Sequence, residues 1–280
     1  MTCIIVCGPT ASGKSDYVLS IPNAYIINGD SMQGYADLQI LTARPDPNLS
    51  NHHLYGISPP NYQDDVVSWR KRVASCIEDA YFKGQTPVVV GGTGFYLDVL
   101  VNGISPIPSV PDDVLTTVKS YSDEELYNCA KEIDPEISLR LKDRQRTQRA
   151  VAVYLATSRS LFDWQKLPRD KLAYNFEIKV VSVDRNLLAD RINKRFEAMV
   201  VSGAIEEVEN LVNAGHAQSP IARALGFKEI EAFLEGNLSK QQMIEQGQLK
   251  TRQYAKRQIT WFNGMGRRNN DGGEMINLIV

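Results

Sequence analysis

The segment Gly8–Ser15 (GPTASGKS) constrains the fold more than any other part of the chain. It fits the phosphate-loop pattern G-x-x-x-x-G-K-[ST] without a mismatch. The apolar run Cys3–Cys7 precedes it, and a helical pattern begins at Asp16. In such a strand–turn–helix unit, backbone N–H groups and the positive end of the helix face an anion. We therefore predict that the chain binds a diphosphate or a triphosphate.

Two side chains of this loop have predicted roles of their own. Lys14 supplies a point charge for phosphate oxygens, and the Ser15 hydroxyl can hold Mg²⁺, the cofactor that we expect. Backbone N–H groups make further contacts. The predicted phosphate-binding residues are Gly8, Pro9, Thr10, Ala11, Ser12, Gly13, Lys14 and Ser15.

Apolar segments alternate with helical ones through the first half of the chain. Ala24–Ile27 and Pro87–Val90 read as strands, and Trp69–Phe82 carries apolar residues at helical spacing. In the second half of the chain, Phe176–Val183 reads as a further strand. Continuous apolar strands that alternate with helices imply a parallel sheet covered on both faces. We expect an α/β fold of the P-loop NTPase type.

A proline-rich run, Ile104–Pro111, interrupts this alternation, and a polar, acidic, helical stretch follows it. We expect a core in two parts, residues 1–108 and 140–280, separated by a small all-helical insertion over residues 109–139. Further helices are expected at about Thr147–Thr157, Leu187–Ser202 and Ser239–Phe262, with a frayed segment over Gly264–Gly273.

Composition excludes several classes of protein. Hydrophobic residues make up 43% of the chain and charged residues 23%, which is ordinary for a globular protein and unlike a disordered one. The four cysteines form no C-x-x-C pair and only three histidines exist, so a structural zinc site is not expected. Without a secretory signal or an apolar run of about 18 residues, we expect a cytoplasmic protein.

Other classes of P-loop protein carry additional sequence motifs that can be looked for here. A GTPase reads guanine with N-K-x-D, whereas Asn193–Phe196 ends in phenylalanine. A motor ATPase ends an apolar strand in Asp or Glu, but the strand Pro87–Val90 leads into Gly91–Gly94. A small-molecule kinase stays open. The second strand delivers Asp30 to the carboxyl edge of the sheet, where ligands bind. Asp30 can accept a proton, order Mg²⁺ or merely cap a helix.

Several further motifs follow one another in a fixed order. They are DSMQ-x-Y (Asp30–Tyr35), T-A-R-P (Thr42–Pro45), HHL (His52–Leu54), VVVGGTGFYL (Val88–Leu97), QR-x-x-R (Gln145–Arg149) and KRQITWF (Lys256–Phe262). Together with the phosphate loop they resemble the tRNA dimethylallyltransferase family, the bacterial-type tRNA isopentenyl transferases, over nearly the whole chain.

The resemblance implies a P-loop α/β core with a helical insertion. It also implies transfer of a dimethylallyl group from dimethylallyl diphosphate to N6 of an adenosine next to the anticodon, usually position 37. Asp30 then matches the family's catalytic carboxylate, and Lys14 and Thr93 bind the donor. Arg191 and Arg195 resemble the family's R-I-x-x-R-F helix, and either one fits a lid over the diphosphate. We expect the enzyme to act as a monomer away from membranes.

The net charge of −2 argues against a nucleic-acid partner, but the basic residues are segregated. Residues 140–181 carry ten Lys and Arg against four Asp and Glu, and residues 250–280 carry six against two. This distribution favours contact with the tRNA anticodon stem-loop. By resemblance, the expected tRNA contacts are Asp30, Ser31, Met32, Gln33, Gln145, Arg146, Thr147, Gln148, Arg149, Arg223, Lys256, Arg257 and Gln258.

The sequence differs from the family pattern at some positions, and other functions also stay open. Gly34 stands where the family usually has a β-branched residue, and Asp37–Leu41 replaces a G-L-D-I-G-type run. An adenylate isopentenyltransferase that uses free AMP, ADP or ATP shares the core, but it needs neither the helical insertion nor the basic motifs. An RNA-binding module without activity accounts for the basic runs but not for Lys14, Asp30 and Thr93 together.

Overall fold

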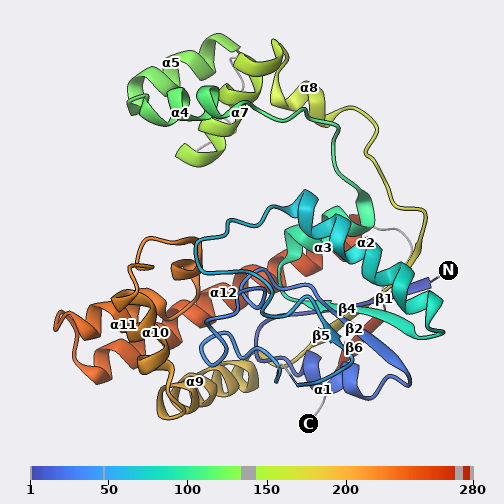
Figure 1. The fold of residues 1–280 in the computed structure, drawn as a ribbon, viewed down its shortest axis with the longest axis vertical. Coiled ribbons are helices and arrows are strands. Elements are labelled where there is room, and N and C mark those ends of the chain that lie inside the picture. The colour runs from blue at the N-terminus through green and yellow to red at the C-terminus, as the bar shows by residue number, and fades with distance from the viewer. Residues whose placement is uncertain (1, 47, 134–142, 269–273, 278–280) are drawn as a thin grey trace. The chain divides into compact units, whose positions relative to one another are not determined.

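The computed structural model describes residues 2–46, 48–133, 143–268 and 274–277, with side chains described up to residue 265 in the last helix. Two compact units make up the chain. The first, here called the core unit, comprises Met1–Val101 and Leu172–Val280, and the second, the helical unit, comprises Asn102–Lys171. Figure 1 shows the elements of each unit.

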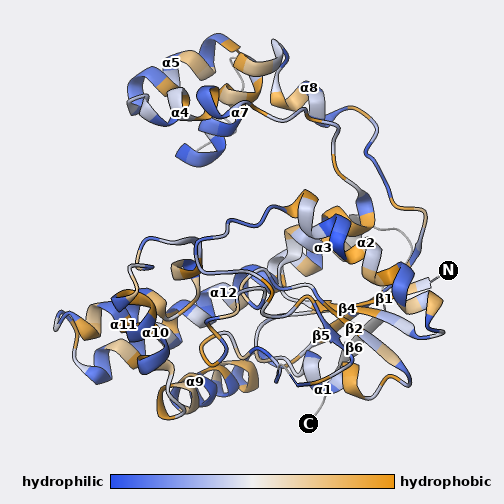
Figure 2. Cartoon of the chain, viewed as in Figure 1, coloured by the Kyte–Doolittle hydropathy of each residue, from blue (hydrophilic) through white to orange (hydrophobic). Residues whose placement is uncertain are grey.

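A parallel sheet forms the centre of the core unit, in the order β3-β2-β4-β1-β5-β6. The strands are β1 (Thr2–Cys7), β2 (Ala24–Asn28), β3 (His52–His53), β4 (Thr86–Gly91), β5 (Asn175–Ser182) and β6 (Glu274–Asn277). Hydrophobic residues are concentrated on these strands in Figure 2. The α/β prediction is confirmed, and the strand predictions near residues 3, 24, 87 and 176 agree with β1, β2, β4 and β5 to within two residues.

Helices cover both faces of this sheet (Figure 1). On one face, Ile5 and Ile27 pack with α2 (Val66–Phe82), α3 (Gly94–Asn102) and the end of α12 (Lys240–Arg268). On the other face, Val6 and Val88 pack with α1 (Lys14–Leu19). Because neighbouring residues of a strand point to opposite faces, each apolar strand supplies both cores.

A second helical layer lies beside the sheet within the core unit. It contains α9 (Arg185–Val201), α10 (Ala204–Asn213), the 3₁₀ turn η1 (Pro220–Arg223), α11 (Phe227–Leu234) and the start of α12. Its core also includes the loop residues Tyr35, Leu38 and Leu41. Helix α12 therefore runs from this layer, where Met243 is buried, to the sheet, where Phe262 is buried. It continues to Arg268, so the expected fraying over residues 264–268 was wrong, and residues 269–273 lie outside the described ranges.

The helical unit contains α4 (Asp112–Ser120), α5 (Asp123–Ile133), α7 (Arg144–Thr157) and α8 (Leu161–Gln165). It is wider than the expected insertion over 109–139, whose last residues, 134–139, lie outside the described ranges. The reason is that α7 belongs to it: Ala150–Val153 are buried against Val118 and Leu126 of α4 and α5. An antiparallel bridge between Ile104 and Asp170 joins the two ends of the unit. Among the described helices, none combines the length and apolar character needed to cross a membrane.

Candidate active site

The phosphate loop has the predicted strand–turn–helix geometry. It leaves β1 after Cys7, and α1 begins at Lys14 with Gly13 as its N-cap, at a φ of 88° that favours glycine. A Cβ on Gly8 would lie 2.5 Å from the carbonyl oxygen of Val181 in β5, so only glycine fits there. Glycine has no side chain, so no side-chain cap accepts from the first N–H groups of α1.

Lys14 folds back over the loop and donates from Nζ to the carbonyl oxygen of Pro9 at 2.7 Å. Burial lowers the pKa of Lys14 to about 8, an effect that the carboxylate of Asp30 opposes and the guanidinium of Arg195 strengthens. The loop, Asp30 and Arg195 therefore form one electrostatic unit, although they come from three separate parts of the sequence.

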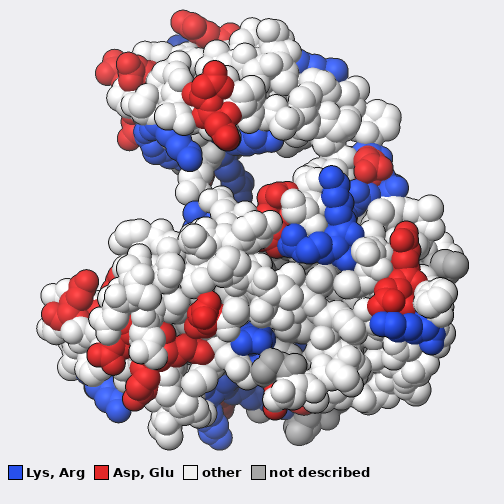
Figure 3. Space-filling view, viewed as in Figure 1, with Lys and Arg blue, Asp and Glu red and all other residues white. Residues whose placement is uncertain are grey.

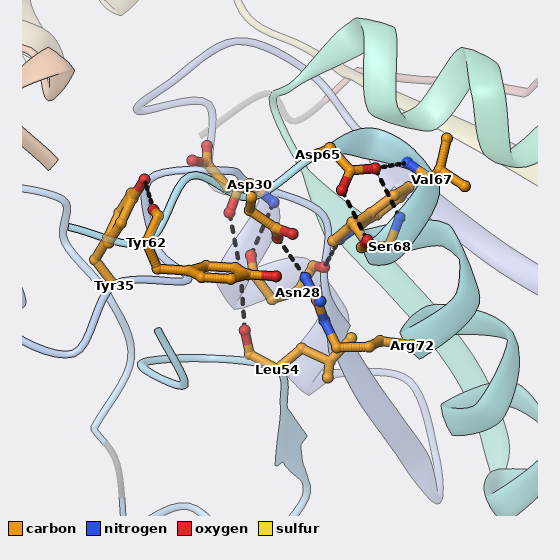
Figure 4. A network of polar contacts seen from close by, with 11 residues as sticks. Asn28, Asp30, Tyr35, Leu54, Tyr62, Asp65, Val67, Ser68 and Arg72 are labelled. Carbon is orange, nitrogen blue, oxygen red and sulfur yellow. Dashed lines mark hydrogen bonds and ion pairs between the residues drawn. The ribbon is translucent and has the colours of Figure 1, made fainter. Parts of the chain in front are cut away.

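Asp30 follows the second strand and is held by its backbone (Figure 4). The buried side chain of Asn28 accepts from the N–H of Asp30 at 2.8 Å and donates to its carbonyl oxygen at 2.9 Å. Asn28 also donates to the carbonyl of Leu54, and its own carbonyl accepts from the indole of Trp69. Oδ1 of Asp30 accepts from the N–H of Met32 at 2.9 Å and so caps a turn. The alternative that Asp30 caps a helix was wrong.

Thr93 connects the ends of β2 and β4. Its hydroxyl oxygen accepts from the N–H of Ser31 at 3.1 Å and lies 3.4 Å from the Ser31 hydroxyl. The phenol of Tyr254 of α12 lies close to Thr93 and Gln258. Burial and the charge of Asp30 raise the pKa of Tyr254, so its hydroxyl stays protonated near neutral pH.

A cavity of about 430 Å³ lies in front of these groups within the core unit. Its polar wall includes Thr10, Asp30, Ser31, Arg195, Arg223, Tyr254 and Arg257. Its apolar wall includes Met32, Leu41, Ile192, Phe196, Met199 and Leu225. The volume suits a small organic ligand or one exposed base rather than a macromolecule.

Arg191 and Arg195 of α9 both face the phosphate loop, where they line a second depression together with residues 11–17 and Ser20. Arg195 also lines the cavity in front of Asp30, whereas Arg191 does not appear in the wall of that cavity. Burial lowers the pKa of Arg195, and the Asp30 carboxylate opposes this effect. The geometry therefore places both arginines beside the phosphate loop, and Arg195 also beside the cavity that contains Asp30.

The residues predicted to contact tRNA fall into separate groups. Lys256, Arg257 and Arg223 are exposed, and the last two line the cavity that contains Asp30. Gln33 instead donates to the carbonyl oxygens of Thr42 and Ala43, which shape the loop beside Asp30. Residues 145–149 begin α7 in the helical unit, where 145, 146 and 149 are exposed.

Gln258 differs from this group. It is 5% exposed, and both atoms of its amide bond to the protein backbone, at Thr10 and Gly92. Its side chain is therefore not presented to a ligand. The sequence also left Tyr254 and Asn28 out of the predicted site. The four-residue spacing of Tyr254 and Gln258 on one helical face is a signal that points to the first of them.

Charge is unevenly spread over the surface. Figure 3 shows acidic side chains gathered over α10 and α11 and over α4 and α5.

Within the described ranges, no group of three or more His, Cys, Asp or Glu side chains is placed to share a metal ion. Ser15 and Asp16 lie at the exposed start of α1, beside the phosphate loop.

Comparison with known proteins gives consistent results. The tRNA dimethylallyltransferase of Zymomonas mobilis is 38% identical over 270 residues, which cover 92% of this chain and 86% of that protein. The tRNA dimethylallyltransferase of Azorhizobium caulinodans is 39% identical over 274 residues, which cover 92% of this chain and 88% of that protein.

Solved structures agree with these relatives. A tRNA delta(2)-isopentenylpyrophosphate transferase from Staphylococcus epidermidis matches with a TM-score of 0.68 at 29% identity, covering 99% of this chain and 92% of that one. A eukaryotic dimethylallyltransferase acting on tRNA matches with a TM-score of 0.85 at 25% identity, covering 99% and 73%. The family model described as IPP transferase matches residues 33–266. The chain therefore belongs to the IPP transferase family.

Proposed function

We propose that this protein is a tRNA dimethylallyltransferase. It transfers the dimethylallyl group of dimethylallyl diphosphate to N6 of adenosine 37 in tRNA and releases diphosphate. One observation carries the proposal: a single cavity is lined by Asp30 and Ser31, by Thr10 and Arg195, and by an apolar wall. A group that binds anions, a carboxylate and an apolar surface are what a prenyl diphosphate and an attacking amine require together.

The donor half of the site stabilises the leaving group. As the bond between the prenyl carbon and the diphosphate oxygen breaks, negative charge grows on the diphosphate. In this proposal the N–H groups of the phosphate loop, the ammonium of Lys14 and the guanidinium of Arg195, which lie around one depression, stabilise that charge. Because these groups are fixed before the reaction, they need little reorganisation.

The acceptor half supplies a base. The N6 amine attacks the prenyl carbon, a new N–C bond forms, and N6 must lose one proton. Asp30 accepts that proton. Hydrogen bonds with Asn28 and with the N–H of Met32 hold Asp30 in place. Thr93 fixes the neighbouring Ser31, so the turn that carries Asp30 keeps its position relative to the donor loop.

The apolar wall suits the prenyl chain. Ile192 and Phe196 are buried on α9, and Met199 lies one turn further along the same helix. Such a surface lowers the free energy of the bound hydrocarbon and keeps water away from the reactive carbon.

Mg²⁺ fits this site as a cofactor that the protein holds with few ligands. Mg²⁺ keeps several waters and is often bound by one or two protein oxygens plus phosphate oxygens. Ser15, at the exposed start of α1, provides such an oxygen without a cluster of acidic residues. When bound, Mg²⁺ would help to neutralise the charge of the diphosphate.

The tRNA contacts remain those expected from the sequence, with Gln258 excepted. An adenine in an anticodon loop must leave its stack to enter a cavity. Exposed Lys256 and Arg257 on α12 lie beside the cavity and are suited to backbone phosphates. Free cysteines, with Cys3 and Cys7 fully buried, suit a reducing compartment, and we propose the cytoplasm.

One assay tests the proposal. The protein is incubated with Mg²⁺ and labelled dimethylallyl diphosphate together with unmodified tRNA, with AMP or with ATP. We expect label on tRNA alone, at N6 of adenosine 37. Label on AMP or ATP would identify an adenylate isopentenyltransferase, and ATP consumption without transfer would identify a kinase. No transfer to any acceptor would refute prenyl transfer.

A further inference from the structure

Gln258 joins two loops that are far apart in the sequence. Its Oε1 accepts from the N–H of Thr10 at 2.8 Å, and its Nε2 donates to the carbonyl oxygen of Gly92 at 2.9 Å. Thr10 belongs to the phosphate loop after β1, and Gly92 to the turn after β4 that carries Thr93. One buried side chain of α12 therefore connects both loops to the same helix.

The fit around Gln258 is close. A Cβ on Gly92 would lie 2.3 Å from Nε2 of Gln258, so glycine at this position leaves the space that the amide occupies. Tyr254 lies one helical turn earlier on the same face, close to both Gln258 and Thr93. These two side chains present a continuous polar face of α12 to the two loops.

The contact with Thr10 has a direct consequence for Lys14. The N–H of Thr10 and the carbonyl of Pro9 belong to one peptide group, which is planar and rotates as a unit. Gln258 binds the N–H end of this peptide, and the ammonium of Lys14 binds its carbonyl end at 2.7 Å. The orientation that Gln258 imposes on the peptide therefore determines where the carbonyl acceptor of Lys14 lies.

We infer that Gln258 is a positioning residue for the donor diphosphate site. It acts through the Pro9–Thr10 peptide on Lys14 and through Gly92 on Thr93. The inference rests on the proposed function. It differs from a tRNA contact, which the exposed neighbours Lys256 and Arg257 on the same helix are placed to make.

The test compares Gln258→Met with the wild-type protein. Methionine has nearly the same length but makes neither hydrogen bond, so packing is retained while both connections are lost. We expect KM for dimethylallyl diphosphate to rise about tenfold, the effect of one to two hydrogen bonds. The Kd for tRNA, measured without donor, should stay within about twofold of the wild-type value.

Two further variants serve as controls. Gln241→Met makes the same substitution at the exposed start of α12, where Gln241 bonds only to Glu245 in its own helix, and it should leave both constants unchanged. Lys256→Ala should show the reverse pattern: the Kd for tRNA should rise, and the KM for the donor should stay unchanged. A Gln258→Met protein that binds tRNA poorly and keeps its donor KM would overturn the inference.

Gln258→Glu provides a readout that a purely structural role would not change. A protonated carboxyl can accept from Thr10 and donate to Gly92, but a carboxylate can only accept. The kcat/KM for the donor, as a ratio to wild type, should therefore be near one at low pH and fall as the new carboxyl ionises. The titratable and charged groups around these loops, Tyr254 and Arg257 of α12, Asp30, Lys14 and Arg195, occur in both proteins, so the wild type measured at the same pH accounts for their own titration.

These outcomes are separable from failure of the proposed function. If the wild-type protein transfers no label to tRNA, the proposed function fails. If the wild type is active but the Gln258→Glu ratio is flat with pH and the donor KM of Gln258→Met is normal, only the inference fails. Should Gln258→Met not fold, as judged by circular dichroism, the pH profile of Gln258→Glu decides alone.

Discussion

Glu207 of α10 holds a loop that forms part of the cavity wall. Its Oε1 accepts from the N–H groups of Gln39 at 2.5 Å and Ile40 at 2.9 Å, and its Oε2 accepts from Leu41 at 3.0 Å. Three successive N–H groups thus point at one carboxylate. Leu41 then lines the cavity that contains Asp30.

The cost of removing this carboxylate can be estimated from these contacts. A hydrogen bond to a charged group contributes about 1.5–3 kcal/mol. Gln39 and Ile40 are only partly buried, so water can replace much of the hydrogen bonding that their N–H groups lose. Leu41 is 5% exposed, so its N–H group has little access to water. We expect Glu207→Ala to lower the free energy of unfolding by about 3 kcal/mol. For a unit of about 200 residues this corresponds to a drop in Tm of about 6–12 °C.

Thermal unfolding followed by circular dichroism measures this change. Glu207→Gln keeps one acceptor oxygen and should lose about half as much stability. Glu209→Ala removes an exposed carboxylate from the same helix and should shift the free energy by no more than about 0.5 kcal/mol. A Tm for Glu207→Ala within 1–2 °C of the wild type, roughly the effect of about 0.5 kcal/mol, would refute the reasoning.

Three other predictions concern the catalytic groups and the sheet. Asp30→Asn keeps an acceptor for the N–H of Met32 but removes the base, so kcat should fall about 100-fold or more while KM for the donor changes little; near-normal turnover would exclude this role. Burial lowers the pKa of Lys14 to about 8, so kcat/KM for the donor should decline as pH rises through this value, and Lys14→Arg should move the decline to higher pH. Gly91→Ala would place a Cβ 2.2 Å from the backbone of Gly29, so we expect little folded protein; a variant with wild-type Tm would contradict the packing of β4 on β2.

Local patterns were sufficient for the centre of the fold. The phosphate loop, β1, β2, β4 and β5 each carry their own signal, because an apolar run between turn residues has few alternatives. Lys14 and Asp30 were found in the same way and Thr93 through the family resemblance, and the topology brings all three together at one edge of the sheet.

Long-range partnerships were not predictable in this way. The buried run Ala150–Val153 suits any apolar surface, and its pattern does not reveal that α4 and α5 provide one. Gln258 and its partner Thr10 are 248 positions apart, and Glu207 and Leu41 are 166 apart. A polar residue in a basic helix looks like a surface contact until its buried partners are known, and this explains the misplaced role of Gln258.

The number of residues in α12 between its contact with α9 and its contact with the phosphate loop fixes the position of Gln258. A Cβ on Gly247 would lie 2.1 Å from the ring of Phe196, so this turn is pressed directly on α9. Eleven residues later, about three helical turns, Gln258 meets the phosphate loop on nearly the same face. Deleting or inserting one residue between them would rotate Gln258 by about 100° and shift it by about 1.5 Å. Substitutions at exposed positions of this stretch therefore keep the register of α12, whereas changes of its length do not.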